Sequence, residues 1–196
     1  MISPVAELSE ENNKYLMRNW IKLIEARTTP EKLETQPLPY SIDDLNPVLS
    51  RNSLEYHYEH LARGYAKRYN ENQGDPDFNR AGSYLHNKFF PQFQKPSGSN
   101  RPKGASLELI ERKFKTFDDF KIAMKEKFMA IQGSGWVYLS TSGDIKTIRN
   151  HAVRTDIALL IDAWEHAWAL DYQWDKEKYF DNIWRIINWN TINDRI

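Results

Sequence analysis

Residues 157–168 place three ionisable side chains directly after an apolar run. The run reads IALLI, and the next residues, DAWEHAW, set Asp162, Glu165 and His166 among Trp and Ala. Five consecutive apolar residues are typical of a strand that is buried on both faces. A carboxylate at the end of such a strand is costly to bury unless it is paired or bound to a metal. Any fold that this chain adopts must therefore provide a partner for Asp162.

The rest of the 196-residue chain reads as helices followed by a small sheet. Helical spacing of apolar residues and capping signals predict helices, with Ser53, Ser106 and Thr116 at the starts of three of them. Short apolar runs after the GSGW break predict a small antiparallel meander. The predicted helices span residues 8–27, 53–69, 79–93 and 176–192, with one more that begins at Ser106 and another that begins at Thr116 and continues to Ile131. The predicted strands span 136–140, 145–149 and 157–161.

These patterns predict an α+β fold. We expect an N-terminal helical hairpin (37–97), then a C-terminal α/β domain (98–196) with a small three-stranded antiparallel sheet flanked by helices. The segment QKPSGSNRPKGA (94–105) has almost nothing to bury, so we place the domain boundary there. Residues 1–36 form an N-terminal helical extension. Its apolar stripe should not face water, so we expect a docking element; the stripe consists of Leu16, Trp20, Leu23 and Ile24.

Composition excludes several classes of function. The 27 basic and 27 acidic residues balance, which argues against general nucleic-acid binding. The chain has no cysteine, so disulfides, thiol nucleophiles and zinc–thiolate sites are ruled out. No apolar run approaches the roughly 20 residues of a membrane span, and no secretory signal is visible. We expect a cytoplasmic protein with no membrane association, or alternatively one of the mitochondrial matrix.

Three of the five histidines have neighbours that suggest more than a surface or core role. His57 lies on the apolar face of its predicted helix, and His86 is flanked by aromatic residues. His166 follows Asp162 by four residues. Together they offer three imidazoles and one carboxylate from four elements, a set that suits iron or manganese. Zinc accepts the same ligands, so the residues alone do not choose the metal.

The stretch DAWEHAW resembles the D-x-W-E-H-A-x signature of the iron/manganese superoxide dismutases. The resemblance covers about residues 37–192, because further stretches occur in the family's order: LPYSIDDLNPVLS, SLEYHYEHLARGY, TFDDFKIAMKEKF, GSGWVYL and YFDNIWRIINW. It implies the family's fold and activity, in which superoxide is converted to oxygen and hydrogen peroxide by redox cycling of one metal ion per chain. Such an antioxidant enzyme would contain iron, which we favour over the alternative, manganese.

The resemblance assigns metal ligands residue by residue. The family's four ligands fall on His57, His86, Asp162 and His166. Glu165 matches a residue that reaches the partner subunit of a homodimer and hydrogen-bonds its ligand histidine, an interaction that orients the ring. A surface acid is the alternative for Glu165.

Other matches surround these ligands. Tyr65 matches the family's gateway tyrosine. Gly82 stands where some members carry the Gln that hydrogen-bonds the metal-bound solvent, so this helix position supplies no such side chain here. His151 stands where other members supply this Gln from the strand region, and it resembles a replacement for it; an ordinary loop histidine is the alternative. The remaining matches are Trp136 and Trp164, which would wall the site, and Lys176, which stands in place of an Arg of the substrate funnel.

The sequence departs from the family pattern outside the ligands. A histidine–tyrosine pair that joins the two subunits in the family is replaced by Leu61 and Ala169, so both halves of one hydrogen bond are missing together. These changes and the extension at 1–36 favour a second hypothesis. In it the chain is a structural subunit on the same fold, docked through residues 1–36 in a larger assembly such as a mitochondrial ribosome, with or without metal. The four intact ligands favour the enzyme.

Overall fold

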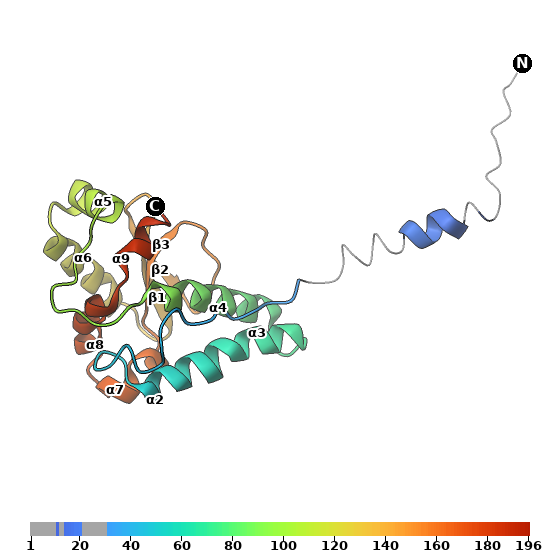
Figure 1. Ribbon diagram of the computed structural model, residues 1–196, viewed down its shortest axis with the longest axis horizontal. Coiled ribbons are helices and arrows are strands. Elements are labelled where there is room, and N and C mark those ends of the chain that lie inside the picture. Colours follow the sequence, from blue (N-terminus) through green and yellow to red (C-terminus); the bar gives the residue numbers. More distant parts are fainter. Residues whose placement is uncertain (1–10, 12–13, 21–30) are drawn as a thin grey trace, which may run out of the picture. The chain divides into compact units, whose positions relative to one another are not determined.

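The computed structural model describes residues 11, 14–20 and 31–196 (Figure 1). Leu33–Ile196 form one compact unit and Met1–Lys32 a separate one. Residue 11 and residues 14–20 are helical, as predicted; the other residues of the predicted helix at 8–27, Leu23 and Ile24 among them, lie outside the described residues. Among the described residues, no helix is long and apolar enough to cross a membrane. The extension's docking role, the domain boundaries and the cellular location stay predictions.

Two long helices form the first half of the larger unit and lie side by side (Figure 1). The first is continuous through α2 (Arg51–Leu54), the π-helical segment η1 (Glu55–Ala62) and α3 (Arg63–Asn70). The second is α4 (Pro76–Phe89), which runs into the short 3-10 helix η2 (Phe90–Gln92). The predicted cap at Ser53 is wrong: the side chain of Ser50 accepts a hydrogen bond from the Ser53 N–H, so the helix begins earlier.

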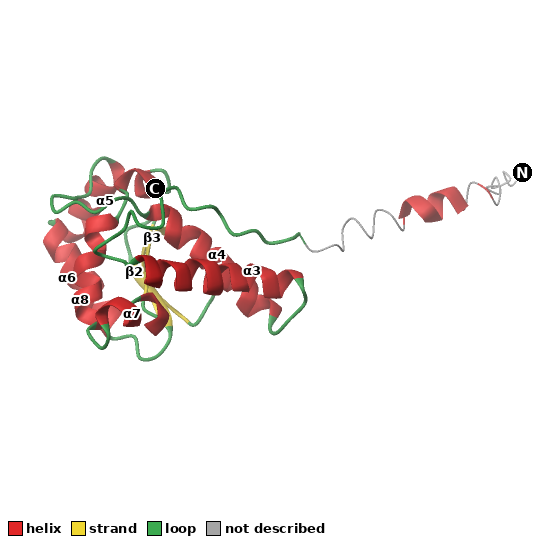
Figure 2. Cartoon of the chain, turned by 60° about the horizontal axis from the view of Figure 1, so that its bottom comes forward, coloured by secondary structure: helices red, strands yellow, loops and turns green. Residues whose placement is uncertain are grey.

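The second half contains the sheet, with helices packed around it (Figure 2). Thr116 caps α6 through the Asp119 N–H, as predicted, whereas the helix before it begins at Ala105 and not at Ser106. The remaining elements are α5 (Ala105–Phe114), α6 (Phe117–Met129), β1 (Gly135–Ser140), β2 (Ile145–Arg149), β3 (Ile157–Asp162), η3 (Glu165–Ala167), α7 (Ala169–Tyr172), α8 (Lys176–Ile183), η4 (Trp184–Ile186) and α9 (Trp189–Asn193). This arrangement confirms the predicted α+β fold.

The sheet is antiparallel, but it is not the predicted meander. Its strand order is β2-β1-β3, so the first strand is the central one. Every residue of β1 and β3 is buried, whereas β2 is mostly exposed. The two apolar strands therefore lie next to each other and the polar strand takes an edge, which removes the most apolar surface from water.

The predicted helix at 176–192 is broken in two. After α8 and η4, Ile187 is extended and forms an isolated bridge with Phe93, and the Asn188 N–H donates to the Gln92 carbonyl. The segment 94–105 buries little, as predicted: Pro102 is its one buried residue. It is nevertheless anchored, because the side-chain amide of Asn100 donates to two carbonyl groups of the segment 184–187. Long-range pairing of the backbone thus overrides local helix propensity here.

Candidate metal centre

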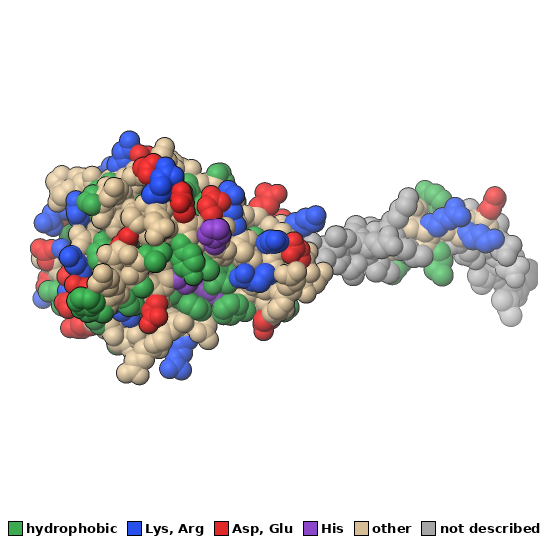
Figure 3. All heavy atoms as spheres, turned by 90° about the horizontal axis from the view of Figure 1, so that it is seen from below, with side chains coloured by type: hydrophobic (Ala, Val, Ile, Leu, Met, Phe, Trp, Pro, Cys, Tyr) green, Lys and Arg blue, Asp and Glu red, His purple; other side chains and the backbone are tan. Residues whose placement is uncertain are grey.

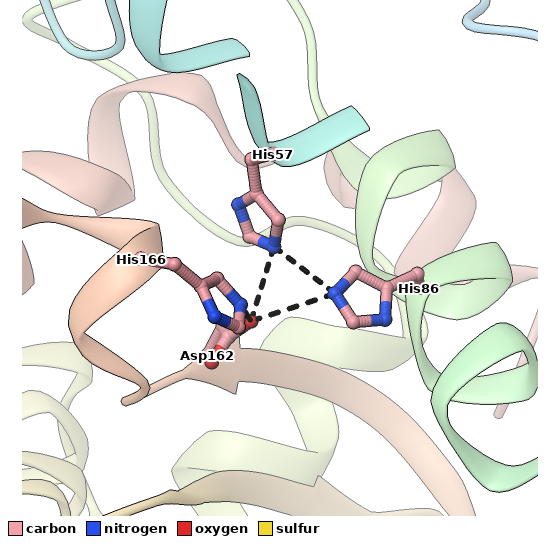
Figure 4. A group of neighbouring side chains, drawn as sticks. All are labelled: His57, His86, Asp162 and His166. Atoms are coloured by element: carbon pink, nitrogen blue, oxygen red, sulfur yellow. Dashed lines mark hydrogen bonds and ion pairs between the residues drawn. The ribbon is translucent and has the colours of Figure 1, made fainter. Parts of the chain in front are cut away.

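Four ionisable side chains meet in the interior: His57, His86, Asp162 and His166. Each offers one ligand atom, and these atoms all lie within 4.8 Å of one another. Figure 4 shows the three imidazole rings turned toward the carboxylate. The Nε2 atom of His57 lies 3.1 Å from Nε2 of His86 and 3.3 Å from Oδ2 of Asp162. The four residues that the sequence predicted as metal ligands therefore lie together in the fold.

The two long helices supply His57 and His86. His57 lies in η1, where the Arg63 N–H bonds to the carbonyl of Tyr58 five residues earlier, the wider spacing of a π-helix. The Nδ1 atom of His86 lies 2.7 Å from the Gly82 carbonyl oxygen. A carbonyl can only accept, so Nδ1 carries the proton and Nε2 keeps its lone pair for the cluster.

The end of β3 supplies Asp162 and, four residues on, His166. Asp162 pairs with Trp136 of the central strand and is fully buried. Its Oδ1 accepts a hydrogen bond from the Trp164 N–H at 2.9 Å, which fixes the carboxylate and leaves Oδ2 for the cluster. The Nε2 atom of His166 lies 3.3 Å from this Oδ2. A tight turn after an apolar strand thus holds two ligands in place.

Burial controls the charges of these groups. It lowers the pKa of His57 to about 4, and the neighbouring His166 adds to this effect while Asp162 opposes it. Burial likewise lowers the pKa of His86 well below its usual value. For the Asp162 carboxyl, burial alone would raise the pKa, but the adjacent His166 and His57 outweigh it and leave the pKa below its usual range. At neutral pH His57 and His86 are therefore neutral imidazoles beside a carboxylate.

This donor set fits a metal ion. The Nε2 lone pair of His86 points at the Nε2 atom of His57, and the Oδ2 atom of Asp162 lies beside both. Lone pairs and a negative charge gathered in a dry interior repel one another unless a cation lies between them. Three imidazoles and one carboxylate are ligands that iron and manganese accept, and the cluster therefore suits either ion.

An aromatic wall encloses the cluster on one side. The ring of Tyr65 lies 5.2 Å from that of His86, and the ring of Trp136 lies 5.1 Å from it. His151 stacks on Trp164 at 4.6 Å. Burial raises the pKa of Tyr65 to about 12, and the charge of Asp162 adds to the rise, so its hydroxyl stays protonated. The fold thus places Tyr65, His151, Trp136 and Trp164 around the cluster, and their roles there stay predictions.

Glu165 and Lys176 occupy a different position. Both line a pocket of about 530 Å³ beside His166, and the Glu165 side chain is exposed there. The Lys176 ammonium donates to the carbonyls of Phe128 and Ile131, both at 3.2 Å, so it holds the end of α6. Figure 3 shows histidine side chains reaching one face, with hydrophobic side chains beside them. Through His166, the cluster therefore borders this pocket.

Two further residues, Phe78 and Gly82, contribute to the site and were not predicted from the sequence. Phe78 packs at 4.7 Å from the His151 ring and at 5.9 Å from the Tyr65 ring. Gly82 was noted only as an empty position, yet its carbonyl orients His86, and a Cβ there would lie 2.8 Å from the Tyr65 ring. A glycine inside a helix costs stability, and that cost is the signal that could have marked Gly82 as a residue with a packing role.

The chain is similar in sequence to a known protein family and to several characterised proteins. A protein-family model described as "Iron/manganese superoxide dismutases, C-terminal domain" matches residues 102–195 of this chain. The chain is 32% identical over 190 residues to a "Superoxide dismutase [Fe]" of Bacteroides fragilis, covering 83% of this chain and 98% of that protein. It is 32% identical to the Bordetella pertussis protein of the same name, covering 78% and 93%. A "Superoxide dismutase [Mn/Fe]" of Porphyromonas gingivalis is 30% identical, covering 81% and 96%.

Replacing the carboxylate tests the cluster directly. We expect Asp162→Ala to abolish metal retention, because the three imidazoles lose the only carboxylate ligand. Asp156→Ala is the matched control, since Asp156 lies just before the same strand and bonds Lys146 on the surface. Elemental analysis of both purified proteins should find metal only in the control; full occupancy in Asp162→Ala would refute the assignment.

Acid should destabilise the metal-free chain. The folded-state pKa of His57 is about 4 against a usual 6.5, so the unfolded chain binds the extra proton more readily between these values. Stability is therefore complete above pH 6.5 and falls as the pH drops toward 4, by an amount on the order of 3 kcal/mol. Urea unfolding at several pH values measures this loss, and His57→Gln should remove much of it. A stability that is flat over this range would contradict the expectation.

Proposed function

The chain belongs to the iron/manganese superoxide dismutase family, and we propose that it dismutes superoxide at one iron or manganese ion held by His57, His86, Asp162 and His166. The observation that carries this proposal is the cluster itself, whose four ligand atoms lie within 4.8 Å of one another. The alternative function, a structural subunit of a larger assembly, gains nothing from keeping such a cluster intact. The intact cluster therefore favours the enzyme.

The ion would supply the redox chemistry, by which two superoxide anions and two protons become one oxygen and one hydrogen peroxide. The protein's part is to hold the ion and keep water away from it. Trp136 has no exposed surface, and Trp164 stacks on both His151 and His166. A dry, rigid surrounding keeps the ligand geometry fixed while the charge of the centre changes, which lowers the cost of each electron transfer.

Protons must reach the product peroxide, and Tyr65 is placed to hold one. Its pKa of about 12 keeps the phenol protonated at neutral pH, and its ring lies 4.8 Å from that of His151. His151 is neutral, since burial lowers its pKa to about 4. Both groups can therefore donate hydrogen bonds toward the cluster without adding charge to it.

Activity after metal loading tests the proposed function. Metal-free chain reconstituted with iron or with manganese should gain superoxide dismutase activity in proportion to bound metal, and zinc should give none because it has no redox chemistry. Stopped-flow decay of superoxide, with elemental analysis of the same samples, gives the activity per metal ion. Full metal occupancy without activity for either ion would refute the enzyme and favour the structural subunit.

We further propose that the chain forms a homodimer over the face that carries Glu165. Glu165 is exposed at the mouth of the pocket, beside the ligand His166, and the same pocket is lined by Trp168. Leu170 and Trp174, 50% and 84% exposed, lie a few residues further along the chain. Exposed apolar side chains of this size are typical of a surface that a partner covers. A second copy would let each Glu165 orient a ligand histidine of its neighbour.

Light scattering tests the dimer. The unmodified full chain should have the mass of two copies, and Glu165→Ala should weaken association and metal retention together, because one residue serves both. Glu108→Ala is the control, since Glu108 is an exposed acid of α5, away from the pocket-lining residues. A single-chain mass for the unmodified protein, or metal retention unaffected by Glu165→Ala, would contradict the proposal.

A further inference from the structure

The outer edge of β3 needs hydrogen-bond partners that a strand does not supply. Among the described residues the strand order is β2-β1-β3, so β3 has a neighbouring strand on one side only. All residues of β3 are buried, and the last of them is the ligand Asp162. Unpaired N–H and C=O groups at a buried strand edge are costly, so other groups must pair with this edge.

The side chain of Gln92 pairs with Leu160 at this edge. Its Oε1 accepts from the Leu160 N–H at 3.1 Å, and its Nε2 donates to the Leu160 carbonyl. A side-chain amide carries an acceptor and donors, as a peptide group does. Gln92 therefore makes the two bonds that a residue of a neighbouring antiparallel strand would make. It has no exposed surface, and its own carbonyl accepts from the Asn188 N–H, so its backbone is held as well.

The guanidinium of Arg195 extends this pairing along the edge. Its Nη1 donates to the Ala158 carbonyl at 3.0 Å and to Oε1 of Gln92 at 3.3 Å. Ala158 and Leu160 are alternate residues of β3, and the backbone groups of alternate residues face the same edge of an antiparallel strand. Asp162 is the next residue of this set. Two side chains thus take the place of a further strand beside β3.

Arg195 also bonds to the helix that carries the ligand His86. Its Nη2 donates to the Lys88 carbonyl at 2.6 Å, near the end of α4. Pro91 has no N–H, so it cannot complete a 3-10 bond to this carbonyl three residues earlier. One guanidinium therefore bonds the backbone of the helix and the backbone of β3 at once.

The bonded backbone groups lie close to metal ligands in the chain. Lys88 follows His86 by two residues, and Leu160 precedes Asp162 by two. The helix α4 also packs directly against β3. A slip of the strand along the helix would therefore break these bonds and change the distance between the two ligands.

Building on the metal centre of the function proposed above, we propose that Gln92 and Arg195 are positioning residues that act through the backbone. This pair, the edge clamp, holds β3 in one register against α4 and so fixes Asp162 relative to His86. Its bonds to these two elements go to main-chain groups. The affinity for a metal ion and the geometry around it depend on residues that hold the ligands in place.

Two substitutions of Gln92 test the bonds of the edge clamp. Gln92→Leu keeps the size of the side chain and leaves both backbone groups of Leu160 unpaired. Gln92→Glu keeps an acceptor for the Leu160 N–H and loses the donor to its carbonyl. Amide hydrogen exchange of the full-length chain should be about fivefold faster at Leu160 in Gln92→Leu, the factor that one neutral hydrogen bond contributes, and should change less in Gln92→Glu. Unchanged exchange in Gln92→Leu would overturn the proposal.

Cobalt(II) reports on the ligands themselves, because its visible absorption bands depend on the number and arrangement of its ligands. Loss of a residue that orients metal ligands typically weakens metal binding about tenfold or more. In competition with a chelator, Gln92→Leu and Arg195→Met should therefore bind cobalt about tenfold more weakly, with shifted bands, and Gln92→Glu should lie between them and the unmodified chain. If Gln92→Leu does not fold, the other two variants decide. Unmodified affinity and bands in both of these would refute the edge clamp.

Asn100→Ala is the matched control for stability. The side-chain amide of Asn100 also pairs with two backbone groups, the carbonyls of Trp184 and Ile187 at 2.9 and 2.7 Å, and neither belongs to an element that carries a ligand. Urea unfolding should show a similar loss of stability in Asn100→Ala and Arg195→Met, while cobalt affinity and bands stay unchanged in Asn100→Ala. A loss of cobalt affinity as large as that in Arg195→Met would refute a positioning role, because any destabilised variant would then bind metal weakly.

Cobalt binding and the activity assay answer separate questions. An inactive iron- or manganese-loaded chain whose clamp variants bind cobalt more weakly would refute the enzyme and leave the edge clamp in place. An active chain whose clamp variants bind cobalt normally would do the reverse. An unmodified chain that binds no cobalt, iron or manganese would refute both.

Discussion

The close approach of one buried carboxylate and three imidazole nitrogens is the constraint on which this structure depends. Asp162 is fully buried, and its Oδ2 lies 3.3 Å from Nε2 of both His57 and His166. In a dry interior these groups are tolerable only with strong compensation, which a bound cation provides for all of them at once. The atoms that face away from the cluster are held by hydrogen bonds as well. The Gly82 carbonyl accepts from Nδ1 of His86, and the Trp164 N–H donates to Oδ1 of Asp162.

The cluster also joins the two halves of the compact unit. Two ligands come from the long helices and two from the end of β3, so an ion bound to all four links a helix pair to a sheet. Binding energy of this kind adds to folding stability, because the unfolded chain has no preformed site. β3 is buried along its whole length, and such a tightly packed strand holds Asp162 at a fixed place relative to the helices.

The sequence predicted the chemistry of the site better than the arrangement of the elements. Asp162 and His166 were recognisable because charged residues in an apolar context need a local reason, and such a reason can be read from neighbours in the chain. The strand order β2-β1-β3 and the break at Ile187 depend on which apolar surfaces meet in space, and the bridge of Ile187 to Phe93 joins residues far apart in sequence. Ser50 was missed as a cap because Ser53, three residues later, offered an equally good local signal.

The packing around Gly82 explains why the polar neighbour of the metal centre comes from the sheet side. A Cβ at this position would lie 2.8 Å from two atoms of the Tyr65 ring, closer than real side chains approach. Any longer side chain there, glutamine included, would have to displace Tyr65 from its place 5.2 Å from the His86 ring. With Tyr65 held, a hydrogen-bond donor can reach the cluster only from elsewhere in its wall. His151, just after β2, lies in that wall. Gly82 leaves room for the Tyr65 ring, and this ring in turn packs against His151.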